Sequence, residues 1–401
     1  MTARVCVVGL GYIGLPTGAL LANSGFEVHG VDVNSANVDT INDGRVHIVE
    51  PDLDELVRDV VAKGALKAST VPAEADVFML CVPTPFRDVD GDPQPNLDFV
   101  IEASRAIAPF VKPGNLVILE STSPVGATEL VARTLQDEGV DTAGLSIAYC
   151  PERVLPGKIL KELVENDRIV GGLDDAAANK VGEFYERFVT GKVLKTDART
   201  AEMCKLTENS FRDVNIAFAN ELSLICDKLG IDVWELISLA NCHPRVEILQ
   251  PGPGVGGHCI AVDPWFIVAS DPEQARLIRQ ARDVNDGKPR WVVNRVLDTI
   301  ENLHGKRVAC LGLAFKPDID DLRESPALQI VRELRGKGVD TINVEPNIDT
   351  HADLPLSSLD EALDQADLVV ILVRHRQFLT EEFAAKLKGK AVFDVCGALK
   401  A

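Results

Sequence analysis

Short apolar runs of strand length alternate along the chain with longer segments whose apolar residues recur at helical spacing. The strand-like runs up to residue 150 are RVCVVG, EVHGVD, DVFMLCV, NLVILE and LSIAYC. Alternation of this kind is typical of a parallel sheet whose strands are connected by helices. It continues to about residue 195 and predicts one α/β domain.

The pattern becomes helical after this domain and then returns to α/β. Residues 199–241 predict two long helices interrupted only at Gly230 and Asp232, and residues 271–304 predict a further helix. The alternation restarts at KRVACLGL near residue 305, continues with a helix from about Ser325, and ends with the runs TINVEP, DLVVILV and AVFDV. The apolar face of the central helices would serve either a dimer interface or the core of its own chain.

We therefore predict an α/β fold with two Rossmann-like, doubly wound parallel-sheet domains joined by a central helical region. The predicted boundaries are residues 1–197, 198–304 and 305–401.

Composition and charge limit the partners of the protein. With 46% hydrophobic and 25% charged residues, the chain resembles an ordinary globular protein. A formal net charge of −20 argues against nucleic acid, because binding to phosphates requires clustered Lys and Arg. The apolar start VCVVGLGYIGLPTGALLA is interrupted by glycines and Pro16, so it predicts a strand, a turn and a helix rather than a signal peptide. No other run approaches the roughly 20 residues of a spanning helix, so we expect no membrane insertion.

Nine cysteines occur without a CxxC pair, which favours reduced thiols in the cytoplasm. One of them, Cys259, stands out because it follows four glycines in GPGVGGHCIAVDP and precedes Asp263 by four residues. A zinc site at Cys242, His243, His258 and Cys259 is rejected, since adjacent ligand pairs differ from the usual spacing of zinc ligands. We expect no metal.

The first strand runs into GLGYIG, where Gly9, Gly11 and Gly14 have the GxGxxG spacing and a helix follows at once. Glycines here permit a tight turn, close approach of the backbone to a pyrophosphate, and close packing of helix and strand. Asp32 ends the second strand, where a carboxylate can accept a hydrogen bond from a ribose hydroxyl. No Arg follows it to bind a 2′-phosphate, so NAD is favoured over NADP.

Further motifs follow the predicted strands in a fixed order: CVPTP (81–85), STSPVG (121–126), YCPERVLPG (149–157), KLTEN (205–209), GGHCIAVD (256–263) and FKPDIDDLRESP (315–326). With the GLGYIGL start, they closely resemble the UDP-glucose/UDP-mannosaminuronate dehydrogenase family of NAD-dependent four-electron dehydrogenases. The resemblance covers nearly the whole chain. The segments CHPRV, GPGVGGHCI and VDPWFI are similar to those of family members that act on UDP-N-acetyl-D-mannosamine.

The resemblance implies a role for Cys259 as the nucleophile of the second oxidation. A thiolate adds to the intermediate aldehyde, the thiohemiacetal loses a hydride to give a thioester, and water releases the acid. By resemblance, Asp263 activates or positions water, Lys205 and Asn209 stabilise an oxyanion and order the water, Glu152 assists hydrolysis, and Thr122 holds a catalytic water. Asp263 before Pro264 could also be a plain helix N-cap. For the first oxidation, both Glu152 and a Lys-bound water are open as the base.

The same resemblance implies two sets of binding residues and an oligomer. Residues 1–197 would bind NAD and residues 305–401 the UDP-sugar, and the expected oligomer is a homodimer or a larger homo-oligomer, to which Arg245 of a neighbouring subunit contributes. The expected cofactor residues are Gly9, Gly11, Tyr12, Ile13, Gly14, Asp32, Pro83, Thr84, Thr122 and Arg323. The expected substrate residues are Glu152, Arg153, Val154, Lys205, Asn209, His243, Arg245, Gly256 and Lys316.

Three alternatives remain at this point. UDP-glucose or another UDP-N-acetylhexosamine would undergo the same chemistry in a different pocket, although GGHC with Val262 differs from the GGSC and Lys usual in UDP-glucose enzymes. A two-electron hydroxyacid dehydrogenase would need no cysteine. An NAD-responsive binding protein would bind the cofactor without turnover.

Overall fold

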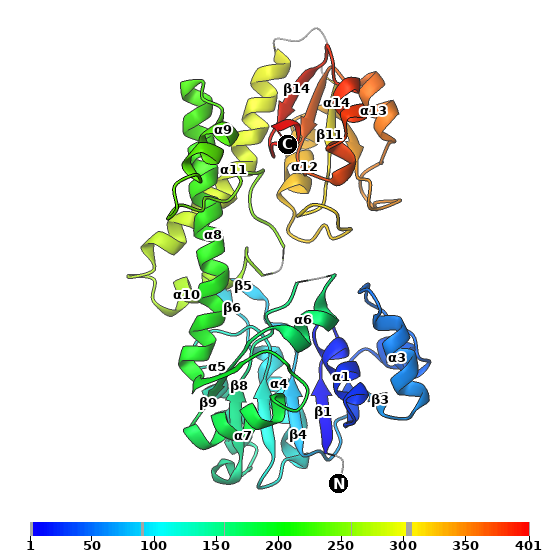
Figure 1. Cartoon of the computed structure of the whole chain (residues 1–401), viewed down its shortest axis with the longest axis vertical. Helices are drawn as coiled ribbons and strands as arrows, with labels where there is room; N and C mark the ends of the chain where they lie inside the picture. Colours follow the sequence, from blue (N-terminus) through cyan, green and yellow to red (C-terminus); the bar gives the residue numbers. More distant parts are fainter. Residues whose placement is uncertain (1–2, 90–91, 156, 258, 302–306, 401) are drawn as a thin grey trace. The chain divides into compact units, whose positions relative to one another are not determined.

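The computed structural model describes residues 3–89, 92–155, 157–257, 259–301 and 307–400 (Figure 1). The chain divides into two compact units, Met1–Thr207 and Glu208–Ala401. The three-domain division therefore stays a prediction. None of the described helices is both long enough and apolar enough to cross a membrane.

The N-terminal unit contains an eight-stranded sheet in the order β10-β9-β8-β7-β4-β1-β2-β3. Its strands are β1 (Arg4–Val8), β2 (Glu27–Val31), β3 (Leu66–Ser69), β4 (Val77–Leu80), β7 (Leu116–Leu119), β8 (Ser146–Tyr149), β9 (Arg168–Gly172) and β10 (Val193–Asp197). The strands from β8 to β3 are parallel, as predicted. β9 pairs antiparallel with β8 and parallel with β10, so an all-parallel sheet is wrong at this edge.

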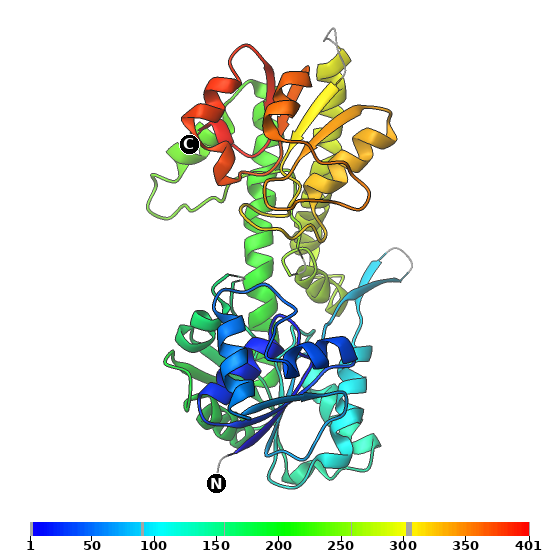
Figure 2. The same ribbon diagram turned by 90° about the vertical axis from the view of Figure 1, so that its right-hand side faces the viewer.

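Helices cover both faces of this sheet because its strand residues alternate between two cores. Val5 and Val7 of β1 pack with residues of α1, α3 and α7, whereas Cys6 and Val8 pack with residues of α4 and α5. The helices of the unit are α1 (Gly14–Asn23), α2 (Ser35–Asn42), α3 (Leu53–Ala62), α4 (Asp98–Ile107), α5 (Ala127–Asp137), α6 (Ile159–Glu165) and α7 (Asp175–Tyr185). A separate antiparallel hairpin, β5 (Phe86–Val89) and β6 (Asp92–Pro95), stands away from the sheet (Figure 2).

The order in which strands are added to the sheet reverses at β1. β2 and β3 lie on one side of β1, and β4 and the later strands lie on the other side. Ligands of open α/β sheets bind at such a switch point, outside the carboxyl ends of the strands. The loops that start there are GLGYIG after β1, CVPTP after β4, STSPVG after β7 and YCPERVLPG after β8. The topology therefore gathers the predicted motifs of the N-terminal unit at one end of the sheet.

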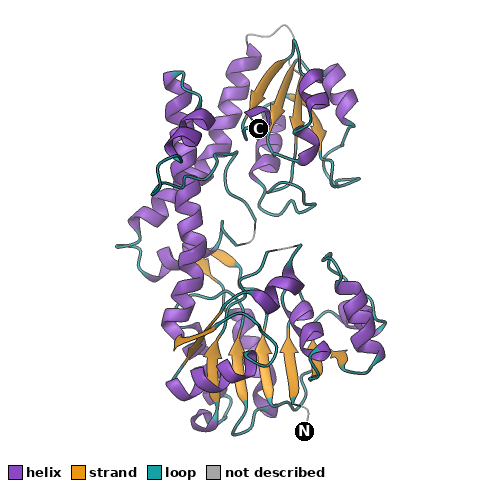
Figure 3. Cartoon of the chain, viewed as in Figure 1, coloured by secondary structure: helices purple, strands orange, loops and turns teal. Residues whose placement is uncertain are grey.

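The C-terminal unit contains a four-stranded parallel sheet in the order β12-β11-β13-β14 (Figure 3). Its strands are β11 (Arg307–Leu311), β12 (Asp340–Val344), β13 (Leu368–Ile371) and β14 (Ala391–Asp394). Residues of α11 (Arg276–Glu301) and α12 (Pro326–Gly336) cover one face, and residues of α13 (Leu359–Gln365) and α14 (Glu381–Lys386) cover the other. The second predicted α/β sheet is confirmed.

The predicted central helices are α8 (Ala198–Leu229), which crosses the boundary of the two units, α9 (Val233–Ala240), α10 (Asp263–Ser270) and α11. A buried polar network joins α8 to α11 within the C-terminal unit. Asp213 accepts hydrogen bonds from Arg282 Nη1 at 2.6 Å and Asn285 Nδ2 at 2.8 Å. Asn220 donates to Asn285 Oδ1 at 2.8 Å and accepts from Gly252 N at 2.9 Å. The network thus holds the start of the glycine-rich segment that leads to Cys259.

Candidate functional site

The GLGYIG turn has the backbone of a dinucleotide-binding loop. Gly9 has φ of +92°, and its N–H donates to Val31 O at 2.8 Å. A Cβ on Gly14 would lie 1.8 Å from Gly9 O, so only glycine fits where α1 begins. A Cβ on Gly11 would meet nothing within 4 Å. The space over Gly11 is therefore open for a pyrophosphate to approach the first turn of α1.

Asp32 lies directly after β2, where the second strand of a dinucleotide site places its acidic residue. Its Oδ2 accepts from Leu10 N at 3.2 Å and its Oδ1 from Asn34 N at 2.9 Å. A carboxylate has about four acceptor sites, so Asp32 can still accept from a ribose hydroxyl. The residues present fit NAD, which would supply the hydride acceptor when bound.

The loops after β4 and β7 are tied to each other, which places Thr84 and Thr122 together. The Thr84 hydroxyl donates to the carbonyl oxygen of Thr122, and the Ser121 hydroxyl donates to Val82 O at 2.6 Å. Pro83, in the loop after β4, is exposed. In the GLGYIG turn, Tyr12 is also exposed and Ile13 is partly exposed. Their contact with NAD stays a prediction, but all lie on the loops of the switch point.

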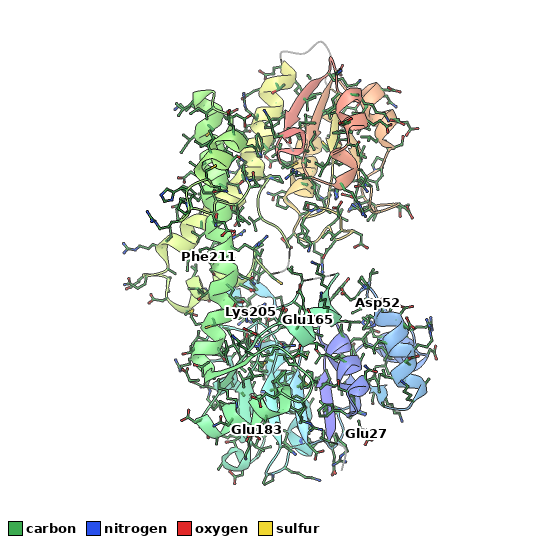
Figure 4. The ribbon with its side chains drawn as sticks, in the orientation of Figure 1. Glu27, Asp52, Glu165, Glu183, Lys205 and Phe211 are labelled. Carbon is green, nitrogen blue, oxygen red and sulfur yellow. The ribbon has the colours of Figure 1, made fainter. Side chains whose placement is uncertain are left out.

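Glu152 and Lys205 form a buried ion pair, although 53 residues separate them in the sequence. Lys205 Nζ donates to Glu152 Oε1 at 3.0 Å and to Glu152 O at 2.8 Å. Glu152 Oε2 accepts from Val154 N at 3.0 Å, which shapes the turn after β8. Lys205 projects from α8 (Figure 4), and both side chains are close to fully buried. The structure therefore brings together the ammonium and the carboxylate that the resemblance assigned to the reaction.

Arg153 sits beside this pair, with its Nη1 donating to Asp167 O at 3.0 Å. The Arg153 carbonyl accepts from Asn166 Nδ2 at 2.7 Å. These contacts connect the loop after β8 to the start of β9. A role for Arg153 and Val154 in binding substrate stays a prediction.

A buried carboxylate that the sequence analysis missed lies beneath these loops. Glu120 follows β7 and accepts from Tyr185 Oη at 2.9 Å and from Cys81 Sγ at 3.3 Å, with Arg168 Nη1 at 3.9 Å. Burial raises the pKa of Glu120 despite the nearby guanidinium. Burial, with the neighbouring carboxylate, also raises the pKa of Cys81 well above its usual range. Cys81 is therefore a structural thiol that anchors the CVPTP loop, and the signal for this site was the acidic end of the run NLVILE.

Glu202 on α8 holds the STSPVG loop in the same way. Its carboxylate accepts from Gly126 N and Thr128 N, both at 2.7 Å, at the start of α5. Because Glu202 precedes Lys205 by three residues on one helix, it also fixes α8 against this loop. Glu202 is fully buried, and desolvation raises its pKa despite these hydrogen bonds.

In the C-terminal unit, Asn209 and Asp263 form a second pair. Asn209 Nδ2 donates to Asp263 Oδ2, and Asp263 is buried. Cys259 is partly exposed, and its carbonyl accepts from Val262 N and Asp263 N at 2.9 Å each. Helix α10 begins at Asp263 with Val262 as its N-cap, so the interpretation of Asp263 as an N-cap is wrong. Its carboxylate is directed to Asn209 instead.

The glycines before Cys259 are required by close backbone packing. A Cβ on Gly256 would lie 2.2 Å from Glu324 O. Gly257 has φ of +86°, and a Cβ there would lie 2.7 Å from the Phe315 ring. The loop is thus pressed onto the FKPDIDDLRESP segment, which carries Lys316, and leaves the Cys259 side chain partly accessible.

The remaining predicted residues of this unit lie on exposed loops. His243 and Arg245 follow α9, and His243 Nδ1 accepts from Arg245 N at 3.3 Å. Lys316 is half-buried, with its Nζ 6.0 Å from the centre of the Phe315 ring. Arg323 forms a bidentate pair with Asp321 at 2.6 and 3.0 Å. Contact of Arg323 with the cofactor stays a prediction.

Within the described residues, no group of three or more His, Cys, Asp or Glu side chains is arranged to hold a metal ion. His258, considered above as a zinc ligand, lies outside them.

Comparisons with known proteins agree across the whole chain. Three models of the UDP-glucose/GDP-mannose dehydrogenase family match: its NAD binding domain over residues 3–189, its central domain over 199–287 and its UDP binding domain over 309–401. The UDP-N-acetyl-D-mannosamine dehydrogenase of Campylobacter jejuni is 57% identical, over 94% of this chain and 96% of the relative. An NDP-N-acetyl-D-galactosaminuronic acid dehydrogenase of Ralstonia nicotianae is 55% identical, over 98% and 95%. A crystal structure of UDP-N-acetyl-mannosamine dehydrogenase from Staphylococcus aureus is 43% identical with a TM-score of 0.91, over 100% and 96%.

Substitution of Gly11 tests whether the first turn binds a dinucleotide. We expect Gly11→Ala to fold normally, because its Cβ meets no protein atom within 4 Å, yet to weaken NAD binding at least tenfold by blocking close approach of the pyrophosphate. Thermal melting and calorimetric titration with NAD would measure the two effects. Gly336→Ala, at the end of α12 and equally free of contacts, is the control and should leave NAD affinity unchanged. Unchanged affinity in Gly11→Ala would contradict this placement of the cofactor.

Proposed function

The chain belongs to the UDP-glucose/GDP-mannose dehydrogenase family, and we propose that it oxidises UDP-N-acetyl-D-mannosamine to UDP-N-acetyl-D-mannosaminuronate. Membership in this family makes it an NAD-dependent nucleotide-sugar dehydrogenase. The observation that carries the proposal is the partly exposed Cys259 in a glycine-rich loop near the buried Asp263, which pairs with Asn209. The identity to the Campylobacter jejuni enzyme supports the choice of sugar.

Oxidation of a primary alcohol to a carboxylate removes two hydrides, each taken up by one NAD. In the proposed reaction, the Cys259 sulfur bonds to the aldehyde carbon formed in the first step, and a proton moves to the new oxyanion. The thiohemiacetal then gives up that proton and a hydride to become a thioester. Water adds to the thioester carbon, the C–S bond breaks, and the thiol is regenerated with the acid. The thiol thus keeps the aldehyde bound between the two oxidations.

The Lys205–Glu152 and Asn209–Asp263 pairs suit the proton transfers of this scheme. Lys205 would remain an ammonium beside the Glu152 carboxylate and stabilise negative charge on the substrate oxygen. Asn209 would hold Asp263 in place so that Asp263 positions the hydrolytic water. Thr122, in the loop after β7, would also hold a catalytic water. Two bases fit the first oxidation, Glu152 and a water bound to Lys205. His243, Arg245, Gly256 and Lys316 would contact the substrate, and Arg245 would act in a neighbouring subunit.

A second substrate is favoured by a specific finding. The Ralstonia nicotianae relative carries the name NDP-N-acetyl-D-galactosaminuronic acid dehydrogenase at an identity close to that of the mannosamine enzyme. Another UDP-N-acetylhexosamine is therefore the first alternative substrate, and UDP-glucose is the second.

We also propose a cytoplasmic homodimer. A cytoplasmic location is supported by the nine cysteines, all within the described part of the chain, each of which keeps its thiol. Support for a dimer comes from α8, where Phe211, Phe218 and Ile225 recur every seven residues and are 70%, 51% and 46% exposed. Apolar residues at this interval are typical of a helix–helix interface.

The number of NADH molecules formed per sugar tests the proposed reaction. We expect two NADH per UDP-N-acetyl-D-mannosamine, measured by absorbance at 340 nm with limiting substrate, and no comparable turnover of UDP-glucose. UDP-N-acetylglucosamine and UDP-N-acetylgalactosamine are assayed in parallel. Two NADH per molecule of another sugar would contradict the proposed substrate and support the cysteine chemistry. One NADH per sugar would contradict the four-electron scheme.

Substitution on the exposed face of α8 tests the dimer. We expect Phe218→Asp to convert a dimer into a monomer in light scattering, because it places a charge in an apolar contact. Phe99→Asp, at a side chain 48% exposed on α4, is the matched control and should leave the mass unchanged. A dimer that persists in Phe218→Asp at micromolar concentration would place the interface elsewhere.

A further inference from the structure

The first turn of the C-terminal sheet repeats the backbone of the first turn of the N-terminal sheet. Gly312 follows β11 with φ of +88° and donates from its N–H to Val344 O at 2.8 Å. Gly9 follows β1 with φ of +92° and donates to Val31 O at the same distance. The sequences of the two turns differ after this glycine. The first turn reads GLGYIG and the second reads GLAFKP, which keeps only the first of the three glycines. The second turn therefore starts like a dinucleotide loop and continues as something else.

The acidic residue after the second strand is used differently in the two turns. Asp32 holds one amide of the turn itself, Leu10 N, as well as Asn34 N beyond the strand, and is partly exposed. Its counterpart Glu345 follows β12, is 5% exposed, and accepts from Leu313 N at 2.7 Å and Ala314 N at 3.0 Å through one oxygen. The longer side chain thus fills the position beneath the turn. The amide of Ala314, which stands where Gly11 stands in the first turn, is thereby held by a carboxylate of the protein itself.

His375, which follows β13, connects this carboxylate to the far end of the turn. Its Nδ1 accepts from the backbone N–H of Asp318 at 2.9 Å, and its Nε2 lies 3.1 Å from Glu345 Oε2. A backbone N–H can only donate, so Nδ1 carries no proton and Nε2–H donates to Glu345. His375 is completely buried. Burial alone would raise the pKa of Glu345, but the hydrogen bonds from His375 and Leu313 N lower it.

Lys316 lies between the two anchored ends of this turn. Ala314 N is held by Glu345, and Asp318 N is held by His375. Phe315 N donates to Asp321 O at 3.1 Å, which fixes the residue next to the lysine. Asp318 has φ of +61°, a left-handed conformation that is uncommon for a residue other than glycine. Its N–H donates to His375 and its side chain accepts from Arg376 N at 3.0 Å, so these contacts hold it in place.

We propose that Glu345 and His375 are positioning residues that hold residues 313–318 so that Lys316 meets the anionic nucleotide of the substrate. This inference rests on the proposed function, in which Lys316 contacts the UDP-sugar. It assigns the second turn a role opposite to that of the first. The first turn leaves open space over Gly11 for a diphosphate, whereas the second has the amides of Leu313, Ala314 and Asp318 held by Glu345 and His375 and presents a cation instead.

Calorimetric titration with UDP tests the proposal without requiring turnover. We expect His375→Phe, which removes the hydrogen bonds of His375 to Glu345, Asp318 N and Asn347 Nδ2, to raise the Kd for UDP about tenfold, as loss of a buried hydrogen bond predicts. The KM for the UDP-sugar should rise similarly, with kcat and the KM for NAD unchanged. His375→Asn places an amide oxygen near the position of Nδ1 and should restore most of the affinity.

His351→Phe is the matched control. His351 Nδ1 also accepts from two backbone amides, Asp353 N and Leu354 N, in a loop of the same unit. We expect its UDP affinity to equal that of the wild type. If His375→Phe does not fold by circular dichroism, His375→Gln, which can keep the contact with Glu345 and lose the acceptor for Asp318, takes its place.

A double-mutant cycle with Lys316→Ala separates positioning from general destabilisation. If His375 acts through Lys316, His375→Phe should weaken UDP binding no further once the lysine is absent. Additive losses, equal losses of UDP and NAD affinity, or wild-type UDP affinity in His375→Phe would overturn the proposal. So would a wild type that does not bind UDP. A wild type that binds UDP but fails to oxidise UDP-N-acetyl-D-mannosamine would contradict the proposed substrate alone, and the UDP cycle would still decide the role of His375.

Discussion

Loops that follow parallel strands leave backbone N–H groups without partners, and in this protein buried carboxylates satisfy them. Glu202 takes two amides at the start of α5, Glu50 takes Gly157 N and Ile159 N at the start of α6, and Glu345 takes two amides after β11. An unsatisfied buried amide costs about 1–3 kcal/mol, so each carboxylate strongly favours one loop conformation. The placement of the predicted motifs depends on these contacts.

This constraint explains how an acidic chain can present groups that suit an anionic substrate. Several carboxylates are turned inward, where they hold amides or pair with cations such as Lys205. Lys316 then stands on a loop whose acidic anchor, Glu345, is buried beneath it. The loop before Cys259 is fixed by close backbone packing instead, since there is no room for a Cβ at Gly256 or Gly257. Fixed loops and a thiol accessible to the substrate are what two successive oxidations of a bound sugar require.

Much of the fold was predictable because apolar runs such as those of β1, β4 and β7 are buried on both faces. β9 and β10 were missed, because RIVGG and VLKTD are less apolar, and their reversed direction leaves no trace in the pattern. The motifs identified the residues of the site, but their pairing depends on contacts between distant segments. Neither the Lys205–Glu152 ion pair nor the hydrogen bond of His375 to Glu345 follows from spacing. Glu120 was overlooked since a buried acid at a strand end resembles an ordinary loop residue.

In the proposed reaction, Cys259 carries the substrate between its two oxidations. Mass spectrometry of the protein, quenched in acid during turnover of UDP-N-acetyl-D-mannosamine with NAD and then digested, would detect this bound intermediate. We expect the peptide containing Cys259 to gain the mass of the substrate less four hydrogen atoms, as a thioester requires. A Cys259 peptide that stays unmodified while a Cys259→Ser variant turns over at the wild-type rate would contradict it.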